Sequence, residues 1–125
     1  MNDQNTLTDG RLAAAISSAV VHILAERTGK GPTKAKTTLG ENGVFVVLQD
    51  NLTRGERNLA ESGEGAAVID VRRRWQRVMQ QEMTSKVEEL TGRKVVGFLS
   101  DHHVDPDIAV EVFVLKRVAR AARDE

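Results

Sequence analysis

The densest group of candidate metal ligands in this sequence lies between residues 101 and 107, where imidazole and carboxylate groups follow one another closely. The four candidates are Asp101, His102, His103 and Asp105. Such nitrogen and oxygen donors suit zinc, manganese or iron. Adjacent strand residues project to opposite faces, however, so the two histidines cannot easily converge on one ion. We therefore favour a hairpin loop stabilised by its aspartates, with a metal sensor or metal-dependent enzyme as the alternative.

A second candidate site is the basic, glycine-containing loop 29–36. Its backbone amides and lysines could bind a small anion such as phosphate or bicarbonate, and the residues concerned are Gly31, Thr33, Lys34 and Lys36. The loop is not a P-loop, because its glycines follow a predicted helix and lead toward a strand. We favour the competing interpretation, a helix C-cap followed by a rigid turn. If a ligand binds, we expect it near Lys34 and Lys36.

A cluster of arginines at 72–74, with Arg77, suggests a nucleic-acid-binding surface. Three consecutive residues of a helix spread over 200° of its circumference, so these arginines cannot form one stripe. The chain has 18 basic and 18 acidic residues, and its aromatic residues are only one tryptophan and three phenylalanines. A nucleic-acid-binding module is therefore our third hypothesis, and we expect no nucleic-acid partner.

Charged residues also occur within the apolar arc of the predicted helix 66–91. They are Arg72, Glu82 and Lys86. Glu82 and Lys86 are four residues apart and can pair with each other, and Arg72 can pair with Glu111, the single charge on its strand face. These four residues lie either at the rim of the core or in a polar patch at a subunit interface, and we weigh the two interpretations equally.

Nucleophilic catalysis has no support in this sequence. The serines have no recognisable motif around them, and His22 lies on the flank of a predicted helix. We therefore expect no enzymatic activity and no cofactor.

Hydrophobic periodicity and stop signals define the helices that position these residues. A helix over 7–28 ends at Gly29, and a second long helix over 66–91 ends at Gly92. Thr53 and Glu56 form a capping box, which predicts a short helix over 54–61.

Runs of β-branched residues predict two hairpins. The four strands are 34–39, 44–48, 95–99 and 108–115. Both faces of the last strand are largely apolar, which indicates a central or interface strand. The two halves of the chain have the same predicted order of elements, a helix followed by a hairpin. We therefore predict an α+β fold of order αββ-ααββ, a mainly antiparallel four-stranded sheet with helices on one face.

The composition fits one small domain. The 125 residues form a single domain with its core over about 7–115 and a charged tail or helix over 116–125. The chain has no cysteine, which a reducing cytosol permits. Residues 1–5 do not resemble a signal peptide, and the apolar runs are far shorter than the ~20 residues of a membrane helix. We expect a cytoplasmic protein without direct membrane insertion.

Several motif blocks together resemble the MpsC-like family. They comprise the loop 29–36, the segment Leu52-Thr53 through Glu56 to Leu59-Ala60, the run 90–96, and Phe98 to Asp101 followed by Asp105-Pro106-Asp107 through 113–115. The resemblance covers roughly residues 16–115. It implies a small cytoplasmic accessory protein of a bacterial sodium-translocating, membrane-potential-generating system that is associated with cation or bicarbonate transport. It transfers no catalytic residue.

Our leading hypothesis is thus a non-catalytic accessory or regulatory subunit. We expect it to dock on a larger assembly, with membrane-bound transporter subunits as its partners. It would act as a homodimer formed through an apolar strand edge or the long helix, peripheral to the inner face of the membrane through a partner.

Overall fold

A computed structural model describes residues 8–118 of the chain. The elements are α1 Asp9–Thr28, β1 Lys34–Leu39, β2 Gly43–Gln49, α2 Arg54–Glu61, α3 Gly65–Thr91, β3 Val95–His103 and β4 Ile108–Leu115. The predicted α+β fold and its helix-hairpin-helix-hairpin order are confirmed. The expectation for 116–125 falls mostly on 119–125, outside the described residues. In the part of the chain that is described, no helix has both the length and the apolar character required to span a membrane.

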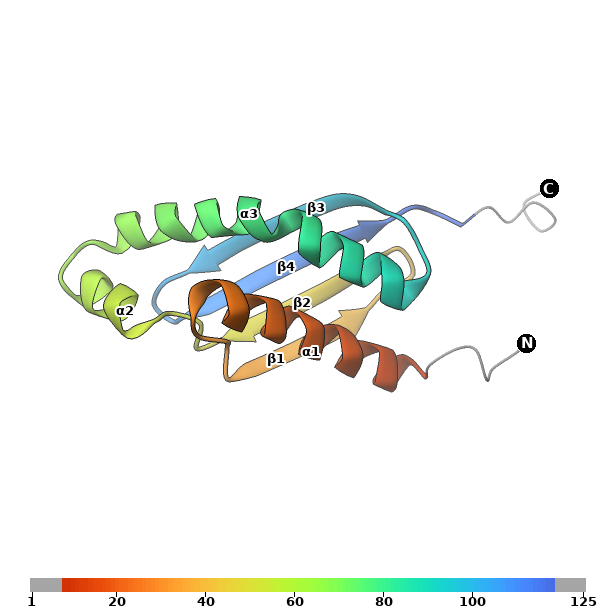
Figure 1. Ribbon diagram of the computed structural model, residues 1–125, viewed down its shortest axis with the longest axis horizontal. Coiled ribbons are helices and arrows are strands. Elements are labelled where there is room, and N and C mark those ends of the chain that lie inside the picture. The colour runs from red at the N-terminus through yellow and green to blue at the C-terminus, as the bar shows by residue number, and fades with distance from the viewer. Residues whose placement is uncertain (1–7, 119–125) are drawn as a thin grey trace.

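The four strands form one antiparallel sheet in the order β1-β2-β4-β3. Each hairpin contributes one central and one edge strand, so the two halves meet along β2 and β4. Figure 1 shows α1 and α3 side by side on one face of this sheet, and α2 at the end of the sheet where β3 ends. The core lies between these two helices and the sheet, and it contains Ile16, Val20, Val46, Met79, Met83 and Phe113.

Both long helices end in the same way. Gly29 and Gly92 have φ angles of 84° and 70°, which the absence of a side chain permits. In each helix the preceding threonine hydroxyl donates to the carbonyl four residues earlier, at 2.8 Å for both Thr28 and Thr91. The similarity between the two halves of the sequence therefore extends to the C-terminal caps of α1 and α3.

The end of β3 differs from the sequence prediction. The strand was expected to stop at Leu99, but it continues to His103 and pairs with β4 along this whole length. Polar residues can extend it because alternate side chains point to the face of the sheet that α1 and α3 leave uncovered, where they remain in water (Figure 1). Ser100 and His102 take the inward positions, and Asp101 and His103 are exposed or face outward. The connecting turn is correspondingly short, at residues 104–107.

Candidate functional site

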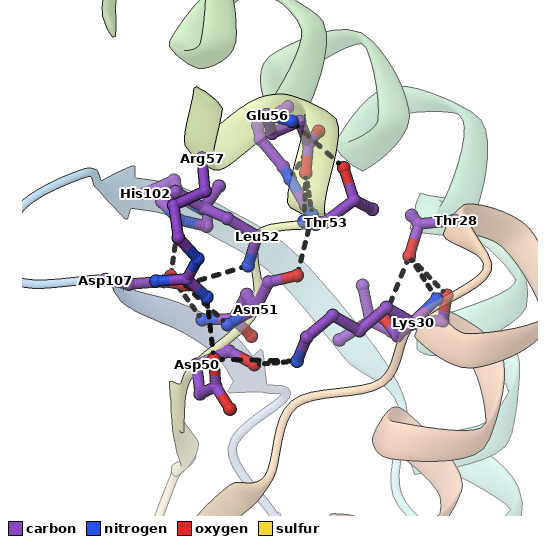
Figure 2. Close-up of polar contacts among 12 residues, drawn as sticks. Thr28, Lys30, Asp50, Asn51, Leu52, Thr53, Glu56, Arg57, His102 and Asp107 are labelled. Atoms are coloured by element: carbon purple, nitrogen blue, oxygen red, sulfur yellow. Dashed lines mark hydrogen bonds and ion pairs between the residues drawn. The ribbon is translucent and has the colours of Figure 1, made fainter. Parts of the chain in front are cut away.

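A cluster of polar side chains lies at one end of the sheet, where the loop after α1 meets the segment after β2 and the β3–β4 turn (Figure 2). Six elements or loops contribute to this polar cluster. Its members are Lys30, Asp50, Asn51, Glu56, Arg57, Arg72, His102 and Asp107. The two loops that carry candidate ligands, 29–36 and 101–107, both reach this end of the sheet.

Arg72 of α3 is the buried cation of the polar cluster, with 3% of its surface exposed. Its guanidinium forms two hydrogen bonds to Glu56, one of them from Nε to Oε2 at 3.0 Å, and Nη2 donates to the Asn51 carbonyl at 2.8 Å. Glu56 also caps α2 by accepting from the Thr53 amide. The expected pairing of Arg72 with Glu111 is wrong, because the start of α2 supplies a carboxylate that reaches the guanidinium first.

Asp107 joins the β3–β4 turn to the segment after β2. Its Oδ2 accepts from the backbone amides of Asn51 and Leu52, both at 2.8 Å, and its Oδ1 accepts from the Asn51 side chain at 3.2 Å. His102 Nε2 lies 3.1 Å from the same Oδ1. One carboxylate thereby holds four donors and fixes two segments that are more than fifty residues apart in the sequence.

His102 is held in its neutral form inside the polar cluster. Burial lowers its pKa below the ordinary value of 6.5, and the nearby Arg72 guanidinium acts in the same direction against the opposing effect of Asp107. A neutral ring that faces a carboxylate through Nε2 carries its proton there and donates it. Only 2% of the His102 side chain is exposed, so the ring is not in contact with the solvent.

Asp50 forms the exposed rim of the polar cluster. Its carboxylate lies 3.0 Å from Arg57 and 3.6 Å from Lys30. A hydrogen bond from the Thr33 side chain, together with these two cations, holds the pKa of Asp50 below its ordinary value of 3.8. The residue adopts a φ of 60°, a conformation that aspartate tolerates better than most residues.

Glu111 is buried beside the polar cluster and forms no ion pair with any residue among 8–118. It is 2% exposed on the inner face of β4, and burial raises its pKa to about 7 although the Ser100 hydroxyl opposes the shift. In the described part of the chain, Glu111 Oε1 and Asn51 Oδ1 have no hydrogen-bond partner. Both residues line a cavity of about 10 Å³ together with Arg72 and His102.

The structure separates the four candidate metal ligands. His102 points inward to Asp107, whereas His103 is exposed and its Nδ1 lies 2.8 Å from the Pro106 carbonyl. Asp101 lies 3.6 Å from Arg73, and Asp105 is exposed. Among residues 8–118, no three histidine, aspartate or glutamate side chains form a group able to hold a metal ion.

The candidate anion-binding residues are brought together only in part. Thr33, Lys34 and Lys36 line one shallow groove on the sheet, with Val47 and Gln49 beside them. Gly31 does not belong to this groove, because it packs against α1, where an added Cβ would lie 3.2 Å from Val21. The two lysine side chains thus remain as donors for an anion, because the Thr33 hydroxyl already donates to Asp50.

The remaining charged candidates lie on the surface of α3. Glu82 pairs with Arg27 of α1 and Lys86 with Glu89, and the Glu82 and Lys86 side chains are close to half exposed. Neither residue belongs to the polar cluster. The expected pair between Glu82 and Lys86 does not form, because each residue pairs with another partner. Arg73 and Arg74 form separate ion pairs with Asp101 and Asp70. The arginine cluster therefore does not form one basic stripe.

A candidate docking surface is the face of the sheet that α1 and α3 leave uncovered, which we call the open sheet face. Its centre is apolar although sheets that face water normally present polar side chains there. Phe45 and Val47 of β2 are 42% and 41% exposed, and Leu99 of β3 is 62% exposed. The apolar members are Phe45, Val47, Leu99, Val110, Val112 and Val114.

Sequence reasoning missed several members of the polar cluster. Asn51 and Asp107 were not singled out as site residues, and Asp50 and Arg57 were not considered. One local signal was the capping box, which identified Glu56 but not its contact with Arg72. A polar Asn51 between the apolar residues of β2 and Leu52 was a second signal, because a buried amide needs partners.

Comparison with known proteins agrees with the resemblance seen in the motifs. Residues 8–117 match the family model described as Na+-translocating membrane potential-generating system (MpsC). The uncharacterized protein YrhF of Bacillus subtilis (strain 168) is 34% identical over 94 residues, which cover 74% of this chain and 77% of that protein. No solved structure matches the chain significantly. On the family match, which spans nearly all of the described residues, the chain belongs to the MpsC family.

Proposed function

We propose that this protein is a non-catalytic accessory subunit that acts by docking on other proteins through its open sheet face. The apolar centre of that face is the observation that supports the proposal. A contiguous exposed apolar surface costs free energy in water, and on soluble proteins such surfaces mark interaction sites. Residues on this face need not be apolar for folding, since the core lies on the opposite face of the sheet.

The polar cluster supports a structural rather than a catalytic role for its histidine. A general base must reach a substrate proton directly or through one water. The His102 ring is almost fully buried and is engaged by Asp107. The charged groups around it are engaged by each other and by backbone amides, so the polar cluster fixes the loops at this end of the sheet.

The family description suggests the assembly on which the subunit docks. It names a Na+-translocating membrane potential-generating system, and our proposal places this chain as its cytoplasmic accessory component. The partners would be membrane-bound transporter subunits, and a role in cation or bicarbonate transport would follow from that association. The protein would then lie peripheral to the inner face of the membrane.

Affinity purification from mildly solubilised native cells tests this proposal. The variant Val47→Glu places a charge in the centre of the open sheet face, and Val78→Glu is its matched control because Val78 is exposed on α3. We expect membrane-bound subunits to co-purify with the wild type and with the control but not with Val47→Glu. Equal recovery with all three proteins, or no partner at all, would contradict the proposal.

Small-anion binding is a finer part of the proposal and rests on the groove lined by Thr33, Lys34 and Lys36. The two lysine ammonium groups suit phosphate or bicarbonate. Titration calorimetry with each anion should give heat that is lost in a Lys34→Ala/Lys36→Ala variant and kept in Lys94→Ala. The absence of heat with both anions would remove this part and leave the docking role intact.

A further inference from the structure

The open sheet face has a charge at each edge, and the strand register places these charges in one row. Lys36 of β1 is opposite Val47 of β2, Val47 is opposite Val110 of β4, and Asp101 of β3 is opposite Val110. This row therefore runs from a cation, across two valines, to an anion, because the Asp101 side chain is 64% exposed although it lies 3.6 Å from Arg73 of α3. The next row is uncharged and runs from Thr38 through Phe45 and Val112 to Leu99.

From this pattern we infer that the occupant of the open sheet face is a second copy of this chain. The inference rests on the proposed docking role of that face. When two identical sheets stack around a two-fold axis parallel to their strands, β1 of each copy lies over β3 of the other and every row keeps its level. Lys36 then faces Asp101 of the second copy, and symmetry repeats the ion pair at the other edge. Val47 and Val110 meet between them.

The other face-to-face arrangement is disfavoured by the same charges. A two-fold axis perpendicular to the strands places β1 over β1 and β3 over β3. The outward lysines of β1, Lys34 and Lys36, then face the same lysines of the second copy. Like charges at close range cost free energy, whereas opposite charges select the orientation. Sheets packed face to face lie ~10 Å apart, a gap that a lysine and an aspartate side chain span together.

The size of the face sets the expected strength of the dimer. Four strands and about six residues along each cover roughly 400 Å² in projection. A standard interface buries about 800 Å² on each partner. We therefore expect a dimer in exchange with its monomer, with a dissociation constant in the micromolar range, so that membrane-bound subunits and the second copy compete for the open sheet face. In this dimer α1 and α3 of both copies lie on the outside.

Sedimentation of the full-length protein over a range of concentrations tests the inference. The wild type should sediment as a monomer–dimer equilibrium, which Val47→Glu abolishes and Val78→Glu leaves unchanged. Lys36→Glu and Asp101→Lys should each raise the dissociation constant about tenfold or more, and the double variant should restore it. Circular dichroism and melting temperature verify that each variant is folded.

A zero-length carbodiimide crosslinker supplies a second readout that does not depend on variants. It joins an amine and a carboxylate only when they touch, and within one chain Lys36 and Asp101 lie on opposite edges of the sheet, about 14 Å apart. A linked peptide containing both residues in a covalent dimer therefore supports the arrangement. Tightening of the dimer by Lys36→Glu would overturn it in favour of the perpendicular axis.

The outcomes separate this inference from the proposed function. A protein that stays monomeric at all concentrations, or a dimer unaffected by Val47→Glu and by the charge exchange, overturns the second copy as occupant. If Val47→Glu still abolishes recovery of membrane-bound subunits in that case, the docking role of the open sheet face stands. A dimer that responds as expected, without any co-purifying subunit, supports the inference and contradicts only the accessory role.

Discussion

Replacing Glu111 by glutamine should stabilise the protein at pH 8 and remove part of the pH dependence of its free energy of unfolding. The carboxyl is buried on the inner face of β4 with no cation in its pocket other than Arg72, which Glu56 already engages. Its pKa is about 7 in the folded protein and 4.5 ordinarily. Below pH 4.5 the group is protonated in both states, and above about pH 7 it is ionised in both.

Between these limits the folded state holds a proton that the unfolded state has released. Stability therefore falls as the pH rises, by about 1.4 kcal/mol per pH unit and by ~3 kcal/mol in total. Glutamine has nearly the same shape and does not ionise. We expect Glu111→Gln to match the wild type near pH 4.5 and to exceed it by up to ~3 kcal/mol at pH 8.

Urea unfolding followed by Trp75 fluorescence at several pH values between 4.5 and 8 measures this difference. His102 acts in the opposite direction, because its lowered pKa makes stability rise as the pH increases through 6.5. Its contribution is common to both proteins and cancels in the difference between them. Parallel curves for the wild type and the variant, or a variant that is less stable at pH 8, would refute the assignment of a raised pKa to Glu111.

Three further substitutions test the contacts that hold the fold. Arg72→Met leaves Glu56 as an uncompensated carboxylate and should cost about 3–5 kcal/mol, part of which Glu56→Gln recovers in the double variant; urea denaturation of the four proteins measures the coupling. Asp107→Asn weakens the acceptor for two backbone amides and should cost about 1–3 kcal/mol, with faster hydrogen exchange at Asn51 and Leu52. Gly92→Ala forces a side chain onto a φ of 70° and should cost about 1 kcal/mol, whereas Gly55→Ala within α2 should be neutral or stabilising by thermal unfolding. Equal effects of the two glycine substitutions would contradict the helix-stop interpretation.

Local signals predicted the elements well because their causes are local. The two long helices end at glycines with positive φ, Gly29 and Gly92, where the sequence predicted their stops. The short helix α2 begins at its capping box, as predicted from Thr53 and Glu56. The end of β3 was missed because polar residues at 100–103 resemble a loop in composition. Pairing accommodates them because Asp101 and His103 are exposed on the uncovered face and the inward His102 contacts Asp107.

The polar cluster was beyond sequence reasoning because its contacts are distant along the chain. Asn51 and Asp107 are 56 residues apart, and Arg72 reaches Glu56 across sixteen. Each residue has an adequate local explanation, as a loop amide, a turn aspartate, a helix arginine and a capping glutamate. Their convergence depends on the strand order, which brings the loop after β2 beside the β3–β4 turn.

Both the sequence and the structure contribute to the identification of the open sheet face as an interaction surface. The apolar residues on both faces of β4 indicated a central or interface strand, and the structure shows a central strand whose outward valines are left uncovered by the helices of residues 8–118. Composition alone could not reveal this, because a second helical layer would produce the same pattern. The position of the charges depends on topology as well. With strands in sequential order, β3 would be internal and Asp101 would not lie at an edge opposite the lysines. The order β1-β2-β4-β3 makes both β1 and β3 edges, and this arrangement gives the face the opposite charges that a two-fold partner with parallel strands can match.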